Sequence, residues 1–302
     1  MRQVYISGQM VPENEAKISI FDTAVTLGDT VTESTRTFKH VPFKLDQHIR
    51  RLYKSLKVTR IDPGCSPDEM KRITEEVVEA NLPEYAEHED LWIVHNISRG
   101  VSMPGPDPTV QSGGATVMIH TLPMDLRGWA TFYTEGCHAV TSMSRIIPSQ
   151  SLDARIKNRS RMAYTLAEME VKLVDPDAQG VILDQDGNVA ENKGGNIFAV
   201  TNGVLRTPPE HNSLAGISRE TVLELAESQN IPNEQVDLQP YDLYTCDELF
   251  FTSTPYCIMP ATKFNGLPVG NGLVGDVTKR LLSAWSERVE MDIVGQATAQ
   301  LD

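Results

Sequence analysis

The chain has 302 residues, of which 40% are hydrophobic and 23% charged, as is typical of a globular protein of one large or two ordinary domains. Its net charge of −14 argues against non-specific binding to nucleic acids or anionic membranes, because both need a basic surface. The four cysteines lack CxxC or His/Cys spacing, so we expect free thiols and no metal site. Without a signal-peptide segment or a run of about 18 apolar residues, we expect a cytoplasmic protein.

Alternating strands and helices are predicted in the first third of the chain. Two short strands flank Ser7, and residues 17–22 (KISIFD) alternate as a strand would. Residues 44–58 place apolar side chains at steps of four, three and four, which predicts a helix with one apolar face.

A capped helix is predicted next. Ser66 is a suitable N-cap, and Glu69 stands three residues after it, as in a capping box. Strands over residues 91–98 and 115–123 follow. The segment that joins them, residues 99–114, is rich in Gly and Pro, and so long a loop in a compact domain is often functional.

The order of these elements predicts an α+β (mixed α/β) protein of two domains. A small α/β domain spans residues 1–121, a linker spans 122–130, and a larger strand-rich domain spans 131–302. Asp186-Gly187 and Asn202-Gly203 predict hairpin turns in the larger domain, whose strand meanders are expected to close toward a barrel.

Two patterns in the larger domain indicate an anion site. Gly216, Ile217 and Ser218 begin a predicted helix, whose first N–H groups and dipole attract anions. Thr254 belongs to a run of hydroxyl residues at the end of a strand, and such hydroxyls bind phosphate or carboxylate oxygens. An ordinary capped helix and a surface threonine are the alternative interpretations.

Glu191 stands close to a pair of glycines. Gly194 and Gly195 permit close approach of the backbone to a ligand, and Asn196 follows them. A carboxylate that faces a heteroaromatic nitrogen keeps that nitrogen protonated. An exposed hairpin glutamate is the alternative.

Lys157 stands just before a predicted helix. A lysine attacks carbonyl groups when burial or neighbouring cations lower its pKa, and Arg155, Arg159 and Arg161 lie close in sequence. A solvated lysine is the alternative. The side chains of the helix that are expected to face the core are Met162, Leu166, Met169 and Leu173.

The lysine, the acid with its glycines, the Gly-Ile-Ser helix start and the Thr-rich strand end occur in that order. With AKISIFDTAVTLGDTVTE and FKLDQHIRRL upstream, this arrangement resembles the fold-type IV pyridoxal-phosphate enzymes. That class contains branched-chain and D-amino-acid aminotransferases, (R)-selective amine transaminases and aminodeoxychorismate lyases. The resemblance covers nearly the whole chain. It implies a D-amino-acid-aminotransferase-like fold with a strand-rich pseudo-barrel domain, a homodimer or higher oligomer, and transamination between an amino donor and a 2-keto acid.

The same resemblance implies pyridoxal 5'-phosphate as the cofactor and a role for each matching residue. Lys157 would hold the cofactor as a Schiff base and transfer the substrate proton, and Glu191 would pair with the pyridine nitrogen. The other implied cofactor contacts are Arg51, Ile217, Ser218 and Thr254 at the phosphate, Leu214 against the ring, and Asn196.

Substrate contacts are expected partly where the sequence departs from the class. Thr32 replaces a usual aromatic residue, Lys193 stands where the class has serine, and Met162 replaces the tyrosine of branched-chain enzymes. Pro255 removes an N–H that could hold a substrate carboxylate. Together with Arg36 and Arg99, the two candidate carboxylate anchors, the predicted substrate residues are Thr32, Lys193 and Pro255.

Two other functions remain open. A lyase of the aminodeoxychorismate lyase type would use the same cofactor and fold. A non-catalytic protein that binds a phosphorylated ligand would keep the helix-start anion site, but it would need neither Lys157 nor Glu191.

Overall fold

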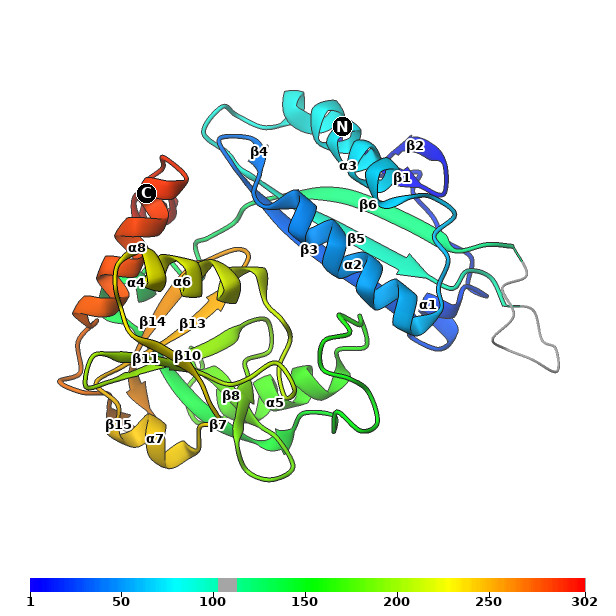
Figure 1. Cartoon of the computed structure of the whole chain (residues 1–302). Helices are drawn as coiled ribbons and strands as arrows, with labels where there is room; N and C mark the ends of the chain where they lie inside the picture. The colour runs from blue at the N-terminus through cyan, green and yellow to red at the C-terminus, as the bar shows by residue number, and fades with distance from the viewer. Residues whose placement is uncertain (103–112, 302) are drawn as a thin grey trace. The chain divides into compact units, whose positions relative to one another are not determined.

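A computed structural model describes residues 1–102 and 113–301. Most of the loop predicted over 99–114 therefore lies outside the described residues. The chain divides into two compact units (Figure 1), the first comprising Met1–Met124 with Ile156–Ser160, and the second Asp125–Arg155 with Arg161–Asp302.

This division differs from the predicted one at two places. The change of unit falls directly after the last strand of the first unit, so residues 122–124 group with the first unit and residues 125–130 with the second. Residues 156–160 return to the first unit because their backbone pairs with one of its strands.

The first unit is built on a six-stranded sheet in the order β2-β1-β6-β5-β3-β4, with every described pairing antiparallel. Helices α2 and α3 lie on one face of this sheet (Figure 1), where a core that includes Leu52, Met70 and Ile93 is fully buried. Its elements are β1 (Gln3–Ile6), β2 (Gln9–Pro12), α1 (Thr23–Thr26), β3 (Thr30–Phe38), β4 (Val41–Pro42), α2 (Leu45–Thr59), α3 (Pro67–Asn81), the 3-10 helix η1 (Leu82–Glu84), β5 (Leu91–Ser98) and β6 (Thr116–Pro123).

Most elements predicted in this unit are confirmed. Helix α3 begins where expected, and the Ser66 hydroxyl accepts a hydrogen bond from the Glu69 N–H at 3.2 Å. The strand predicted over residues 17–22 is wrong, since Ile20 and Phe21 are 71% and 52% exposed and pair with no strand. Asp22 ends this segment as the N-cap of α1 and accepts a hydrogen bond from the Ala24 N–H. The alternation of apolar and polar residues therefore leads into a helix and not into a strand of the sheet.

The second unit is built on a nine-stranded sheet in the order β12-β11-β10-β13-β14-β7-β8-β9, with β15 paired to β14. Because β9 at one end of this path contacts β10, the sheet curls into a partly closed barrel. Its strands are β7 (Cys137–Arg145), β8 (Gln179–Leu183), β9 (Val189–Glu191), β10 (Asn196–Thr201), β11 (Val204–Thr207), β12 (Asn233–Gln235), β13 (Glu248–Ser253), β14 (Cys257–Phe264) and β15 (Leu267–Pro268).

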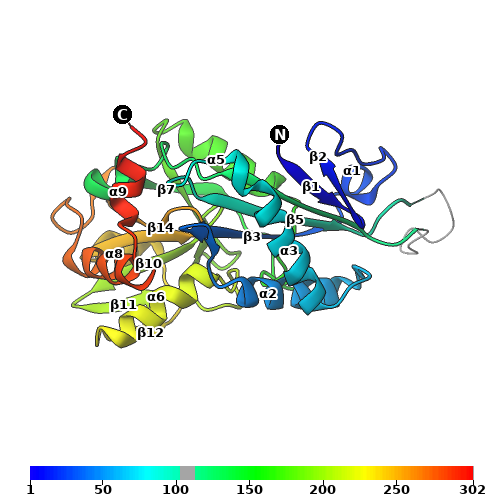
Figure 2. The same cartoon turned by 90° about the horizontal axis from the view of Figure 1, so that it is seen from above.

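Helices cover this sheet from different strands. Helix α5 packs on β7 and β8, whereas α6 and α8 lie side by side and contact β13 and β14 (Figure 2). The helices are α4 (Phe132–Glu135), α5 (Met162–Lys172), α6 (Ile217–Ser228), α7 (Pro240–Thr245), α8 (Asp276–Arg288) and α9 (Ile293–Thr298). Both predicted hairpins, β8-β9 and β10-β11, are confirmed. Among the described residues, no helix has both the length and the apolar character needed to span a membrane.

The predicted inward face of α5 is wrong. Ala167 and Val171 face the sheet instead, where Gly180 leaves room for Val171. The helix carries two apolar stripes, and the one with smaller side chains allows it to approach the strands closely. The larger stripe is exposed by 77%, 51%, 62% and 87% at Met162, Leu166, Met169 and Leu173.

Candidate functional site

The backbone of Lys157 is held by hydrogen bonds on both sides. The Thr32 N–H donates to the Lys157 carbonyl at 2.8 Å, and the Lys157 N–H donates to the Ser55 hydroxyl of α2 at 3.2 Å. The Arg159 N–H also donates to the Thr30 carbonyl at 2.8 Å. Lys157 therefore lies on a short segment added to the edge of β3, with its side chain half-buried rather than fully solvated.

A buried acid lies next along the same strand. Glu33 accepts from Arg51 Nε at 2.9 Å and from Arg51 Nη2 at 2.6 Å, and His48 Nδ1 lies 3.0 Å from the same carboxylate. Arg51 and His48 both project from α2 and are less than 9% exposed. Glu33 therefore holds the guanidinium of Arg51 in a two-point ion pair.

Charges determine the protonation of this cluster. Burial alone would raise the pKa of Glu33, but the positive charge of Arg51 and the hydrogen bond from His48 hold it well below its ordinary value. Burial lowers the pKa of His48, and the charges of Arg51 and Lys157 act in the same direction. At neutral pH, Glu33 is therefore an anion and His48 is neutral.

Two of the three arginines near Lys157 in sequence have partners of their own. Arg155 binds Asp153 through Nε at 2.9 Å and through Nη2 at 2.6 Å. The guanidinium of Arg161 lies 3.7 Å from the centre of the Tyr164 ring. Proximity in sequence alone therefore does not assign the charges of Arg155 and Arg161 to the lysine amine.

The second unit holds Glu191 between two donors. Tyr164 of α5 donates its hydroxyl to Glu191 Oε1 at 2.6 Å, and the Leu214 N–H donates to Oε2 at 3.0 Å. Glu191 is 7% exposed. The acid is therefore a buried carboxylate with a defined orientation, not an exposed hairpin residue.

Leu214 also links the acid to the start of α6. Asn196 donates its side-chain amide to the Leu214 carbonyl at 2.9 Å. A Cβ on Gly216, the N-cap of α6, would lie 2.0 Å from the oxygen of that amide, Oδ1. The structure thus brings Glu191, Asn196, Leu214 and the N–H groups at the start of α6 together within one unit.

The paired glycines lie against the end of β13. A Cβ on Gly195 would come within 2.2 Å of the Thr252 carbonyl, and the Ser253 hydroxyl donates to the Gly194 carbonyl at 2.6 Å. Thr252 pairs with Asn196 across the two strands, so their side chains share a face. The buried hydroxyl of Thr252 has no hydrogen-bond partner among the described residues, which leaves a donor available for a ligand on that face.

Lys157 and Arg51 belong to the first unit, whereas Glu191, Asn196, Leu214, Ile217, Ser218 and Thr254 belong to the second. Thr254 and Pro255 follow β13, and both are half-buried.

The residues predicted to contact substrate have other contacts in the first unit. Arg36 is 1% exposed, lies over the Phe38 ring at 4.0 Å and faces Asp90 at 3.6 Å. Arg99 binds Asp29 through Nε at 2.6 Å and donates to two carbonyls at the end of α2. These contacts favour structural roles over carboxylate anchoring.

Thr32 and Lys193 are also engaged. The Thr32 hydroxyl is buried and donates to the His95 carbonyl at 2.8 Å. Lys193 is exposed and forms an ion pair with Glu168 of α5. Thr32 therefore contacts β5 through its side chain and the Lys157 segment through its backbone.

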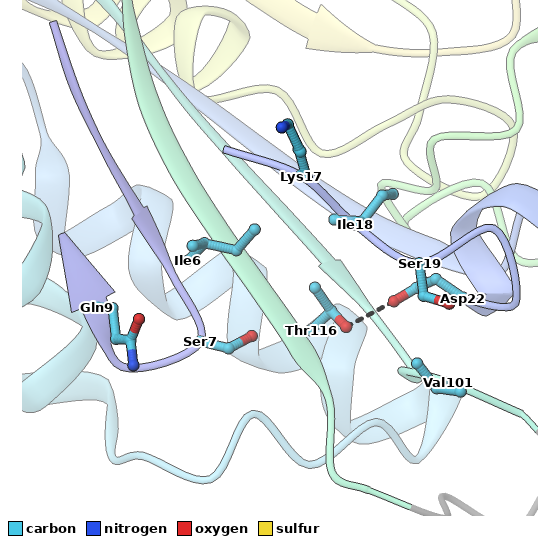
Figure 3. Close-up of a pocket in the computed structure, with 9 residues that line it drawn as sticks. All are labelled: Ile6, Ser7, Gln9, Lys17, Ile18, Ser19, Asp22, Val101 and Thr116. Atoms are coloured by element: carbon cyan, nitrogen blue, oxygen red, sulfur yellow. Dashed lines mark hydrogen bonds between the residues drawn. The ribbon is translucent and has the colours of Figure 1, made fainter. Parts of the chain in front are cut away.

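A separate pocket of about 340 Å³ lies in the first unit (Figure 3). At its wall, Thr116 donates to Asp22 Oδ2 at 2.6 Å. Ser98, which does not line the pocket, donates to Oδ1 of the same carboxylate at 2.6 Å. The described residues that line this pocket are Ile6, Ser7, Gln9, Lys17, Ile18, Ser19, Asp22, Val101 and Thr116. None of these lining residues belongs to the predicted site.

Comparison with known proteins identifies the family. A family model described as "Amino-transferase class IV" matches residues 30–264, which is most of the chain. The chain belongs to the class IV aminotransferases. It is 36% identical over 281 residues to a Methanocaldococcus jannaschii protein described as "Putative branched-chain-amino-acid aminotransferase", covering 92% of this chain and 93% of that protein.

Solved structures show the same similarity. The T.th. branched-chain amino acid aminotransferase in complex with N-(5'-phosphopyridoxyl)-L-glutamate has a TM-score of 0.85 and 28% identity to this aminotransferase, covering 95% of this chain and 94% of that one. A structure of the same enzyme with pyridoxamine 5'-phosphate has a TM-score of 0.84 at 28% identity and the same coverage. The two-domain α+β fold expected from the resemblance is thereby confirmed, and pyridoxal 5'-phosphate is the cofactor of this class.

Within each unit, described residues have the chemistry that this cofactor needs. Glu191 offers a buried carboxylate for a protonated ring nitrogen, and the first N–H groups of α6, which lack a side-chain cap, offer an anion site with Ser218. Thr252 adds a buried hydroxyl without a partner among the described residues. Within the first unit, Lys157 has an amine and Arg51 a cation.

Sequence reasoning missed three residues that form hydrogen bonds with Arg51, Lys157 and Glu191. Glu33 lies one residue after Thr32, Ser55 lies one helical turn after Arg51, and Tyr164 lies on α5. An acidic residue inside a strand of mostly uncharged residues is a signal that could have identified Glu33, because a buried charge requires a partner. Tyr164 could be found only from the packing of α5 on the sheet.

Proposed function

We propose that this class IV aminotransferase transfers the amino group of a branched-chain-like amino acid or related primary amine to a 2-keto acid. The observation that carries this proposal is the buried Glu191 carboxylate, which is tied through Leu214 to the start of α6. A plain phosphate-binding protein needs no such acid. The similarity over the whole chain to branched-chain aminotransferases supports the same choice.

Each residue of the site has a chemical task. Bound pyridoxal phosphate supplies an electron-accepting ring that draws the electron pair from the Cα–H bond of the donor. Lys157 holds the cofactor, and its Nζ carries the proton away from that carbon. Glu191 holds the proton at the ring nitrogen. Arg51, Ser218, Thr254 and the first N–H groups of α6 bind the phosphate.

The substrate pocket is proposed to differ from that of branched-chain enzymes. Arg36 and Arg99 are engaged by Asp90 and Asp29, so a substrate carboxylate is held without the two arginines first considered. Pro255 offers no N–H at the end of β13, which weakens carboxylate binding there. We therefore propose that donors lacking a carboxylate are accepted beside amino acids.

Single amino donors without a keto acceptor test this proposal. L- and D-amino acids with branched side chains and (R)-amines are each mixed with the holoenzyme, and the absorbance of the cofactor is followed. An aminotransferase converts its cofactor to the pyridoxamine form with at least one donor. Absence of conversion with every donor, together with release of pyruvate from aminodeoxychorismate, would favour the lyase instead.

We also propose that the protein is a homodimer or higher oligomer. The class resemblance implies it, and the larger apolar stripe of α5 supports it. Four large apolar side chains on one exposed helix face are unusual on a monomer, because water contact with them is unfavourable. A second copy of the chain is the proposed cover.

A further inference from the structure

Tyr164 is held firmly beside Glu191. Its ring packs against a small cluster formed by Ile146, Ala167, Ile182 and Ala190. Ile182 pairs with Glu191 across β8 and β9, so the ring and the acid meet on the same pair of strands. The phenol can therefore reach Glu191 Oε1 at 2.6 Å without a mobile linker, since its rotamer is fixed by packing.

The two oxygens of Glu191 share their charge between two unlike donors. The Leu214 N–H on Oε2 is a backbone group whose position α6 fixes, whereas the Tyr164 hydroxyl on Oε1 comes from a replaceable side chain. A carboxylate has about four acceptor positions, so both oxygens can still accept from a ligand. A short O–H···O⁻ bond withdraws negative charge from the acceptor.

Arg161 lies on the other side of the phenol. Its guanidinium stacks over the Tyr164 ring at 3.7 Å, a cation–π contact that draws electron density from the ring. Burial raises the pKa of Tyr164, as does the negative charge of Glu191, so the hydroxyl remains a donor at neutral pH. Tyr164 thus contacts a cation, Arg161, through its ring and an acid, Glu191, through its hydroxyl.

We propose that Tyr164 is a positioning residue for Glu191 that orients its carboxylate and limits how strongly it holds a proton on the ring nitrogen of the cofactor. This inference rests on the proposed role of Glu191 in the aminotransferase. Arg161 strengthens the effect by making the phenol a better donor. The site predicted from the sequence included neither residue.

Replacing Tyr164 with phenylalanine removes the hydroxyl and keeps the packed ring. Glu191 then carries more charge and holds the ring nitrogen proton more tightly. A more positive ring disfavours a second positive charge elsewhere on the conjugated cofactor. We therefore expect the pH midpoint of the absorbance change of the bound cofactor to move lower by about 0.5–1 unit in Tyr164→Phe.

Two further variants separate this effect from a loss of packing. Tyr133→Phe removes another buried hydroxyl of the same unit, which donates to the Tyr256 carbonyl at 2.8 Å, and should leave the midpoint unchanged. Arg161→Met leaves the Tyr164 hydroxyl in place and should move the midpoint in the same direction by a smaller amount. It decides the question if Tyr164→Phe does not bind the cofactor.

An unchanged midpoint in Tyr164→Phe, or in Arg161→Met where the first variant is unloaded, overturns the inference. If wild-type protein binds the cofactor through Lys157 but the pH midpoint is unchanged in the variants, only the positioning role of Tyr164 is refuted. If wild-type protein binds no cofactor, or binds it through another lysine, the proposed function fails with it.

Discussion

One buried histidine, His95, should make the stability of the first unit sensitive to acid. His95 is fully buried in β5, and its Nε2 lies 2.8 Å from the Thr74 hydroxyl of α3. Burial lowers its pKa to about 4. An unfolded histidine binds a proton near pH ~6.5, so the unfolded state takes up a proton in a range where the folded state does not.

Stability should therefore fall as the pH drops from about 7 to about 5. The contribution of His95 to that loss is about 2 kcal/mol in unfolding free energy, from the difference between a pKa near 6.5 and one near 4. Urea unfolding of His95→Gln should show a smaller loss between the two pH values than wild type. His88→Gln, at an exposed position, is the control; an equal loss in all three proteins would refute the account.

Residues that the proposed function assigns to the chemistry were predicted where they belong to sequence motifs. Lys157 and Glu191 were predicted because a lysine, an acid with glycines and a helix start occur in one order. Tyr164 was not, since its partner Glu191 is 27 residues away and the contact depends on which stripe of α5 faces the sheet. The sequence does not reveal that Asp90 and Asp29 pair with Arg36 and Arg99, whose substrate contacts stay a prediction.

At the scale of elements, local capping and turn chemistry predicted more than periodicity did. Ser66 and the turn at Asn202-Gly203 act through neighbouring backbone, so their effect is visible in sequence. Residues 17–22 and helix α5 both show a periodic pattern of apolar residues. To predict the strand or the buried helix face correctly, one must also know which element each segment packs against. Close backbone contacts between β9, β10 and β13 were suggested by the glycine pair alone.

The two glycines of that pair should respond differently to alanine. In Gly195→Ala the new Cβ meets the Thr252 carbonyl at 2.2 Å, a backbone atom that cannot turn aside, so we expect a loss of about 1–3 kcal/mol and weaker cofactor binding. Gly194→Ala has no atom within 4 Å of its new Cβ and should change stability by less than about 0.5 kcal/mol. Thermal unfolding and cofactor titration measure both; equal behaviour of the two variants would contradict the account.

At the scale of the whole molecule, the exposed apolar stripe of α5 is the feature that supports the proposed dimer. Its side chains Met162, Leu166, Met169 and Leu173 gain free energy when they leave water. The protein that carries them also has a net charge of −14, which opposes association. In the proposed dimer, burial of the stripe by a second copy must outweigh this charge repulsion.

A glutamate in that stripe should weaken assembly. Leu166→Glu would bury a charge in the interface, and we expect at least about a tenfold increase in the dimer dissociation constant. Ser283→Glu adds the same charge at an exposed position of α8, on another helix, and should leave assembly nearly unchanged. Sedimentation velocity over a range of concentrations distinguishes them. A monomeric wild type, or equal weakening by both variants, would be inconsistent with a dimer through this face.

The central claim is that this class IV aminotransferase holds pyridoxal 5'-phosphate through Lys157, and borohydride reduction followed by peptide mapping tests it most directly. The reduced holoenzyme should carry one phosphopyridoxyl group on the peptide containing Lys157. Lys193→Ala, which removes the lysine nearest Glu191 in sequence, should keep that label, and Lys157→Ala should lose it. A label on another lysine, or no label in the wild-type protein, would contradict the account.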